Sequence, residues 1–178
     1  MSTTQQATTA IPTGTWNRDP VHSDLGFAVS YSGAGTFRGT FDEFDATLVD
    51  GRLEGTAKVA TVRVDDPNLA GHLQSPDFFD AEQHPELRFV SSSIARDGND
   101  VSIEGDITLR GVTKPVTITG TVVGPTQDAY GKERIAFDVE TTVDRRDFAI
   151  SWNLELPTGD PALGNDVKIT ANLALVQA

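Results

Sequence analysis

The chain of 178 residues contains no cysteine. Disulfide bonds, thiolate metal sites and cysteine nucleophiles are therefore excluded. Basic residues are also scarce, with 14 Lys and Arg against 26 Asp and Glu and a net charge of −12. An acidic surface repels phosphate backbones and anionic lipid headgroups, so we expect no nucleic-acid partner and no polybasic membrane anchor.

Long apolar runs are missing as well. No run reaches the roughly 18 residues that a transmembrane helix needs, which predicts no membrane insertion. The opening MSTTQQATTAIPTGTW has neither the basic nor the apolar region of a signal peptide. We therefore expect a cytoplasmic protein, or a periplasmic or secreted one if a leader has been removed. Residues 1–13 are rich in Thr and Gln, which predicts a disordered tail before one domain at 14–178.

The motifs of common enzymes and metal sites do not occur. There is no G-x-S-x-G elbow, no Gly-rich phosphate loop and no HExxH. The three histidines, His22, His72 and His84, match no metal-ligand spacing. These absences predict no catalytic residue, no metal and no resident cofactor.

What the sequence does contain is apolar residues at every second position. In segment 101–109, Val101 and Ile103 alternate with Ser102 and Glu104. The same alternation recurs in segments 25–31, 116–122, 135–141 and 167–175. This period is typical of antiparallel strands that bury one face, and it predicts an all-β fold.

Segments 37–50, 52–64 and 86–94 bring the total to about eight strands. Eight strands can close into a barrel whose interior holds one small ligand, although a β-sandwich is the competing arrangement. Glycines inside the expected strands favour the barrel, because sharply bent strands need them. These glycines are Gly39, Gly55, Gly105 and Gly120.

Segment 66–84 is the one clear exception to the alternation. Asp66 and Pro67 are suited to the N-cap and first turn of a helix, and Pro76 would end it. We expect a short helical plug at roughly 66–80 that closes one end of the barrel. It presents four apolar side chains, namely Leu69, Leu73, Phe78 and Phe79.

Several stretches of the chain resemble the YceI-like family, the polyisoprenoid-binding, lipocalin-like proteins. They are TWNRDPVHSDLGFAVSY, RGTFDEFDATL, HLQSPDFFDAEQHPELRFVSSSI, EGDITLRGVTKPV and RRDFAIS. The stretches occur in the family's order and spacing, and the resemblance runs from about Trp16 to the C-terminus. It is most specific in the segment from His72 to Phe89.

The resemblance implies an eight-stranded, lipocalin-like antiparallel barrel whose pore holds a long isoprenoid or fatty chain. It implies no settled catalysis, and members are often homodimers. The chain departs from the family at Ala149, where glycine is usual, and this predicts a less bent or more crowded loop.

The expected ligand contacts are mainly aromatic and aliphatic residues on the strands and the plug. For any single residue, filling the core is the simpler interpretation, but the set is suited to an apolar pocket. The set comprises Phe27, Phe37, Phe41, Leu69, His72, Leu73, Phe78, Phe79, Phe89, Phe137, Phe148 and Trp152.

His22 and Arg146 are the candidates for contact with a polar head group, and His72 could reach one if it points inward. Each has a simpler alternative. For the histidines this is a structural hydrogen bond, and for Arg145 and Arg146 it is a surface salt bridge.

Together these patterns predict a protein that binds, transports or stores an elongated apolar lipid, such as a polyisoprenoid, an isoprenoid quinone or a fatty-acid-like molecule, without catalysis. One alternative is an enzyme that acts on a small apolar substrate with His72 or His22 as acid–base group. Another is an interaction module with a self-filled barrel, which would have an exposed apolar patch and no internal tunnel.

Overall fold

The computed structural model describes residues 10–178. Most of the expected N-terminal tail, residues 1–9, lies outside the described part of the chain. The rest of it forms no helix or strand, and Ile11 packs against the hydrophobic core. Trp16 Nε1 donates a hydrogen bond to the Thr13 carbonyl over 3.0 Å.

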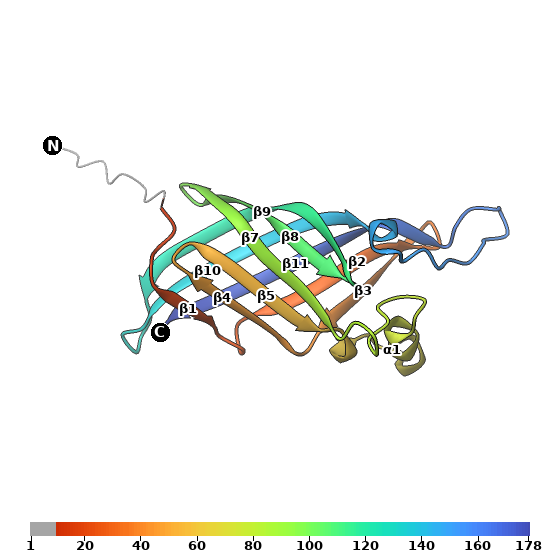
Figure 1. Ribbon diagram of the computed structural model, residues 1–178, viewed down its shortest axis with the longest axis horizontal. Coiled ribbons are helices and arrows are strands. Elements are labelled where there is room, and N and C mark those ends of the chain that lie inside the picture. Colours follow the sequence, from red (N-terminus) through yellow and green to blue (C-terminus); the bar gives the residue numbers. More distant parts are fainter. Residues whose placement is uncertain (1–9) are drawn as a thin grey trace.

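Strands make up most of the chain (Figure 1). They are β1 (Thr15–Arg18), β2 (Asp24–Tyr31), β3 (Gly35–Phe41), β4 (Phe44–Val49), β5 (Arg52–Lys58), β6 (Val62–Arg63), β7 (Glu86–Asp97), β8 (Asp100–Leu109), β9 (Val112–Gln127), β10 (Glu133–Asp144) and β11 (Leu163–Gln177). The helices are η1 (Val59–Thr61), α1 (Pro67–Gln74) and η2 (Arg145–Phe148).

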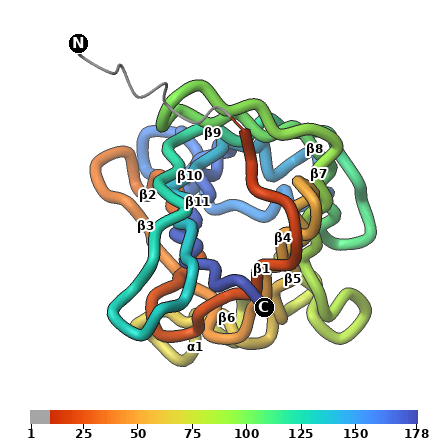
Figure 2. Tube along the Cα trace, turned by 90° about the vertical axis from the view of Figure 1, so that its left-hand side faces the viewer, coloured from red at the N-terminus to blue at the C-terminus, as the bar shows by residue number. Residues whose placement is uncertain are grey.

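Eight of the strands form a closed antiparallel ring in the order β1-β4-β5-β7-β8-β9-β10-β11, with β11 pairing back to β1. Figure 2 shows the chain running around this ring. The prediction of an eight-stranded antiparallel barrel with one short helix is therefore confirmed, and the β-sandwich is excluded because the ring closes.

Strands β2, β3 and β6 extend the wall beyond the ring. The last residues of β11 pair with β1, whereas its earlier part, from Leu163 to Asn172, pairs with β2. The expected strands 37–50 and 52–64 are each broken in two, at Asp42–Glu43 and at η1. Both breaks lie where the chain passes between the ring and its extension.

The helical plug is confirmed in its main features. Asp66 is the N-cap of α1, where its side chain accepts a hydrogen bond from Asn68 N over 2.8 Å, and Pro67 occupies the first turn. Cap and proline together satisfy or remove amide donors that a helix start leaves unpaired. Leu73 is the buried residue of α1 and points to the barrel interior.

A polar clasp fixes the β1–β2 turn to the barrel wall. Asp19 accepts hydrogen bonds from Arg134 Nη1 at 2.8 Å and contacts His22 Nδ1 at 2.7 Å. Its amide donates to the Ala174 carbonyl of β11, and Ser23 Oγ accepts from the Ala174 amide. The hydrogen bonds from Arg134 and then His22 hold the pKa of Asp19 well below its usual range.

One end of the barrel is filled by its own side chains. Six large apolar residues that line neither cavity are almost completely inaccessible there: Trp16, Leu48, Val122, Ile135, Phe137 and Leu175. Strand β1 and the C-terminus lie at this end, and α1 lies at the opposite one (Figure 1). Of the two ends, the α1 end is the one at which the described residues leave a sizeable cavity. Within residues 10–178, no helix is long and apolar enough to span a membrane.

Candidate functional site: an apolar cavity at the helical end of the barrel

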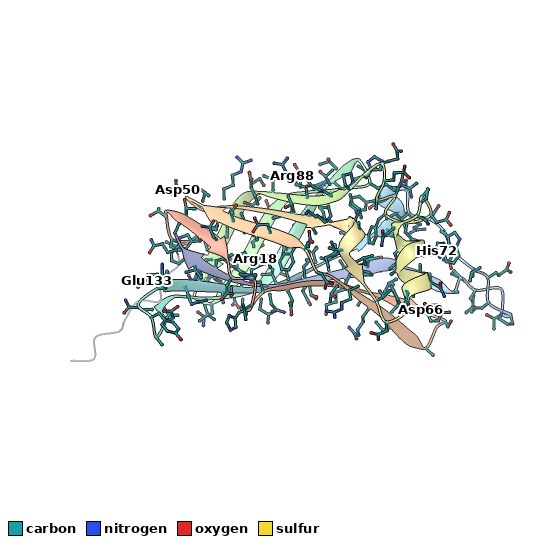
Figure 3. The ribbon with its side chains drawn as sticks, turned by 90° about the horizontal axis from the view of Figure 1, so that it is seen from below. Arg18, Asp50, Asp66, His72, Arg88 and Glu133 are labelled. Carbon is teal, nitrogen blue, oxygen red and sulfur yellow. The ribbon has the colours of Figure 1, made fainter. Side chains whose placement is uncertain are left out.

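A cavity of about 430 Å³ opens at the α1 end. Its walls come from β2, β3, β7, β8, β10 and β11, and it is covered by α1, by the turn that follows α1 and by residues 148–154. Figure 3 shows His72 and Asp66 at this end and Asp50 and Glu133 at the other. The lining is apolar except for Tyr31, His72 and Arg145.

Four phenylalanines form one side of the cavity. Phe27 packs against Phe37, Phe41 and Phe79 with ring centroids 5.8 to 6.1 Å apart, and Phe41 lies 5.7 Å from Phe79. Phe27 can take its position because Gly39 has no side chain, since a Cβ there would overlap its ring. Strand β2, strand β3 and the plug thus meet in one aromatic cluster.

A second cluster packs α1 and the turn after it against the segment that follows η2. Trp152 lies 4.6 Å from the His72 ring and 5.4 Å from Phe78, and His72 lies 4.9 Å from Phe78. The His72 Nε2 contacts Asp77 Oδ2 at 3.0 Å, and Arg110 Nη1 donates to the Phe78 carbonyl over 3.0 Å. These contacts hold the plug against the barrel rim.

Arg145 is the single charged side chain in the cavity lining, and only 4% of it is exposed. Its Nε donates to the Gly164 carbonyl over 2.8 Å, and Nη1 donates to those of Ile150 and Trp152 over 3.1 and 2.8 Å. Its Nη2 is buried and has no hydrogen-bond partner among the described residues. Burial lowers the pKa of this guanidinium.

A smaller cavity of about 90 Å³ lies deeper in the barrel. It shares Leu25, Leu87 and Ile169 with the larger one, and its remaining lining includes Phe44, Phe89 and other residues of the wall. The three shared side chains therefore stand between the two spaces.

Most of the expected ligand contacts come together around the larger cavity: Phe27, Phe37, Phe41, Leu69, His72, Leu73, Phe78, Phe79, Phe148 and Trp152. Phe89 lines the smaller cavity. Phe137, which is 1% exposed, lies in the filled end of the barrel and reaches neither space. Its side chain points inward as expected, but it lies at a depth in the barrel where other core side chains leave no room for a ligand.

The structure places both head-group candidates outside the cavity. The His22 side chain is 68% exposed and belongs to the clasp with Asp19. The Arg146 side chain is 59% exposed and pairs with Asp144 at 2.6 Å. Hydrogen bonds from Arg146 lower the pKa of Asp144 to about 2. Both residues therefore have local partners on the outer surface. This agrees with the simpler alternatives, a structural hydrogen bond for His22 and a surface salt bridge for Arg146.

Arg145 is the cavity residue that sequence reasoning missed as a head-group candidate. A signal for it exists, because the buried positions of β10 are Ile135, Phe137, Val139 and Val143, and Arg145 continues the same alternation. The predicted strand 135–141 ends two steps of this alternation before Arg145, so the prediction does not place the arginine on the inward face.

The loop after η2 differs from its expected shape. Ala149 adopts a left-handed conformation with φ 59° and ψ 27°, and its amide donates to the Arg146 carbonyl over 3.1 Å. Of the two predicted alternatives, a less bent or a more crowded loop, the structure does not show the less bent one. The chain reverses here despite the Cβ, and the turn places Ile150 and Trp152 where Arg145 can bind their carbonyls.

The remaining polar chemistry is limited. Among residues 10–178, no cluster of three or more His, Asp and Glu side chains has a metal-binding arrangement. In the same part of the chain, His72 lines the cavity and contacts one other titratable side chain, that of Asp77. The cavity is therefore suited to binding an apolar molecule through the shape of its walls rather than through polar contacts.

The family model of the YceI-like domain matches residues 16–175. The chain belongs to the YceI-like family. Protein YceI of an Escherichia coli O17:K52:H18 strain is 33% identical over 145 residues, which are 78% of this chain and 76% of that protein.

Solved structures share this YceI-like fold. Burkholderia cenocepacia BcnA matches with a TM-score of 0.72 at 22% identity, covering 88% of this chain and 98% of that one. A polyisoprenoid-binding domain from Saccharophagus degradans, implicated in plant cell wall breakdown, matches with a TM-score of 0.70 at 14% identity, covering 92% and 98%. At these identities the likeness shows the fold alone.

Proposed function

We propose that this YceI-like protein binds one elongated apolar lipid, of the isoprenoid or fatty-acid-like class, and carries or stores it without changing it chemically. The observation that carries the proposal is the apolar cavity of about 430 Å³ at the α1 end. Its volume lies in the range of roughly 300–1,000 Å³ that small-molecule sites occupy.

The lining is suited to a chain with few polar atoms. Each methylene group removed from water contributes about 0.8 kcal/mol, and the sum must exceed the entropy lost on association. A hydrocarbon chain therefore gains affinity from dry, close-fitting walls without a set of polar partners. The aromatic cluster of Phe27, Phe37, Phe41 and Phe79 provides such a wall.

Family membership supports the same ligand class. The domain from Saccharophagus degradans with this fold is described as polyisoprenoid-binding. A polar end on the ligand would find Arg145, the one cation of the lining, whose unpartnered Nη2 can donate to an oxygen.

The enzyme alternative depends on His72. This histidine lines the cavity and has a second polar group, Asp77, within 3.0 Å. Its ring is also packed edge-on against Phe78 and Trp152, as expected of a residue that secures the plug. A structural role explains all of these contacts, so we favour binding over catalysis. The interaction-module alternative predicts a filled barrel, and the cavity at the α1 end argues against it.

Native mass spectrometry of the purified protein, before and after extraction with organic solvent, tests the proposal. We expect either a co-purified apolar molecule that the solvent removes, or uptake of added farnesol at one molecule per chain by the extracted protein. A protein that neither carries nor takes up an apolar chain would overturn the proposal. Chemical conversion of the added chain would favour the enzyme instead.

A further inference from the structure

We infer that the barrel limits the chain length of its ligand: the larger cavity accepts a chain of about 14 atoms, and Leu25, Leu87 and Ile169 set this limit. We call these three side chains the constriction. The inference rests on the proposed function, because it specifies which apolar chains the cavity holds.

The constriction brings together opposite parts of the wall. Leu25 lies on β2 and Ile169 on the paired strand β11, whereas Leu87 lies on β7 on another side of the ring. All three line both cavities, so a chain that passes from the larger to the smaller one must pass between them. Leu87 is buried, and its position is fixed by pairing with Ala57 of β5.

The volumes convert into a chain length. If each chain atom occupies about 30 Å³, the share of one water molecule in the liquid, the larger cavity of about 430 Å³ holds about 14 atoms. The smaller cavity of about 90 Å³ would add about three more if the constriction opened. Three isoprene units, the chain of farnesol, correspond to the first volume.

Beyond the smaller cavity, buried side chains of the described residues fill the barrel. The filled end of the barrel contains Trp16, Leu48 and Phe137, each at most 2% exposed. A longer molecule can extend only through the mouth, where Tyr31 and Leu154 line the cavity and are 52% and 57% exposed. Carbon atoms outside the mouth remain in water and contribute little affinity.

The inference predicts a plateau in affinity with chain length. We would measure competition by native mass spectrometry among geraniol, farnesol, geranylgeraniol and a much longer polyprenol, which differ in the number of isoprene units. From geraniol to farnesol, affinity should increase at least about tenfold, because the added unit is buried. From farnesol onward it should change less than about threefold.

Variants of the constriction should move the plateau. Leu87→Ala joins the two cavities and should raise the affinity for geranylgeraniol relative to farnesol about tenfold. Ile169→Phe, at a half-buried position, fills the inner end of the larger cavity and should move the plateau toward geraniol. Leu48→Ala is the matched control, because it removes the same atoms from the filled core and lines neither cavity.

The outcomes separate this inference from the proposed function. If none of the alcohols binds, the proposed function itself fails. If wild-type affinity continues to rise tenfold per isoprene unit beyond farnesol, the protein binds apolar chains but does not limit their length. If Leu87→Ala folds and its affinity levels off at the same chain length as that of Leu48→Ala, the constriction does not limit the length of the bound chain. Should Leu87→Ala not fold, the wild-type series and Ile169→Phe still decide the question.

Discussion

Arg145 and Arg146 are adjacent in the sequence but lie in different environments. Arg145 is buried in the cavity lining and binds three backbone carbonyls, whereas Arg146 pairs with Asp144 in solvent. A planar guanidinium with five donors can bridge several carbonyls at once, which a lysine could not do in the same geometry. Arg145 thus positions residues 150–164 at the mouth of the cavity and leaves the two N–H donors of Nη2 for a ligand.

Ala149 supplies a prediction at the residue scale. Its left-handed backbone costs an L-residue about 1–2 kcal/mol, which a glycine avoids. Glycine also has a more flexible unfolded chain, which offsets about 0.4–1 kcal/mol. Ala149→Gly should therefore raise the free energy of unfolding by about 0.5–1 kcal/mol in urea denaturation.

Ala136→Gly is the matched control for Ala149→Gly. Ala136 is exposed on strand β10, where glycine should lower stability by about 0.5–1 kcal/mol. Equal losses of stability in the two variants would contradict the strain assigned to Ala149.

At the scale of elements, the Asp19 clasp joins the β1–β2 turn to β10 and β11 near the place where the ring closes. The motif NRDPVHS therefore has a structural explanation. Asp19, His22 and Ser23 all contact the barrel wall or one another, and none of them lines a cavity. The clasp fixes the point at which the chain leaves the ring for its extension.

Acid should weaken the clasp. The pKa of Asp19 is lower in the folded protein than the roughly 3.9 of an unfolded chain, so its contribution to stability is complete above that value. The contribution is lost as the pH falls through the folded pKa. Between about pH 5 and pH 2, the wild type should lose more stability than Asp19→Asn, which lacks the titrating carboxyl.

Urea denaturation at a series of pH values measures this difference. Asp147→Asn serves as the control, because Asp147 is exposed and is not part of the clasp. It should keep the wild-type acid sensitivity. If Asp19→Asn loses stability with acid as steeply as the wild type, the clasp does not provide the expected contribution.

Much of the element structure could be predicted from the sequence, because it depends on local patterns. The alternation of β8, with Val101, Ile103, Ile107 and Leu109 buried, follows from the period of a strand. The start of α1 follows from Asp66 and Pro67. The breaks between β3 and β4 and at η1 were not predicted, because they arise from the change of strand partners rather than from local sequence.

At the scale of the whole molecule, the barrel has a filled end and an open end. The sequence could predict which side chains point inward, but it could not assign their depth along the axis. Phe137 and Phe148 are both buried aromatic residues, yet the first completes the core and the second lines the cavity. Depth depends on the stagger of all eight strands, which no single segment encodes.

The central claim is that the cavity at the α1 end holds an apolar chain, and filling the cavity tests it most directly. Val167→Phe places a ring at a half-buried position of the lining, and Val123→Phe makes the same change on the outer wall, where Val123 is 55% exposed. Equilibrium binding of farnesol to the wild type and both variants is the decisive measurement. We predict that Val167→Phe weakens binding at least about tenfold and that Val123→Phe binds like the wild type. Unchanged binding by a folded Val167→Phe would contradict the account.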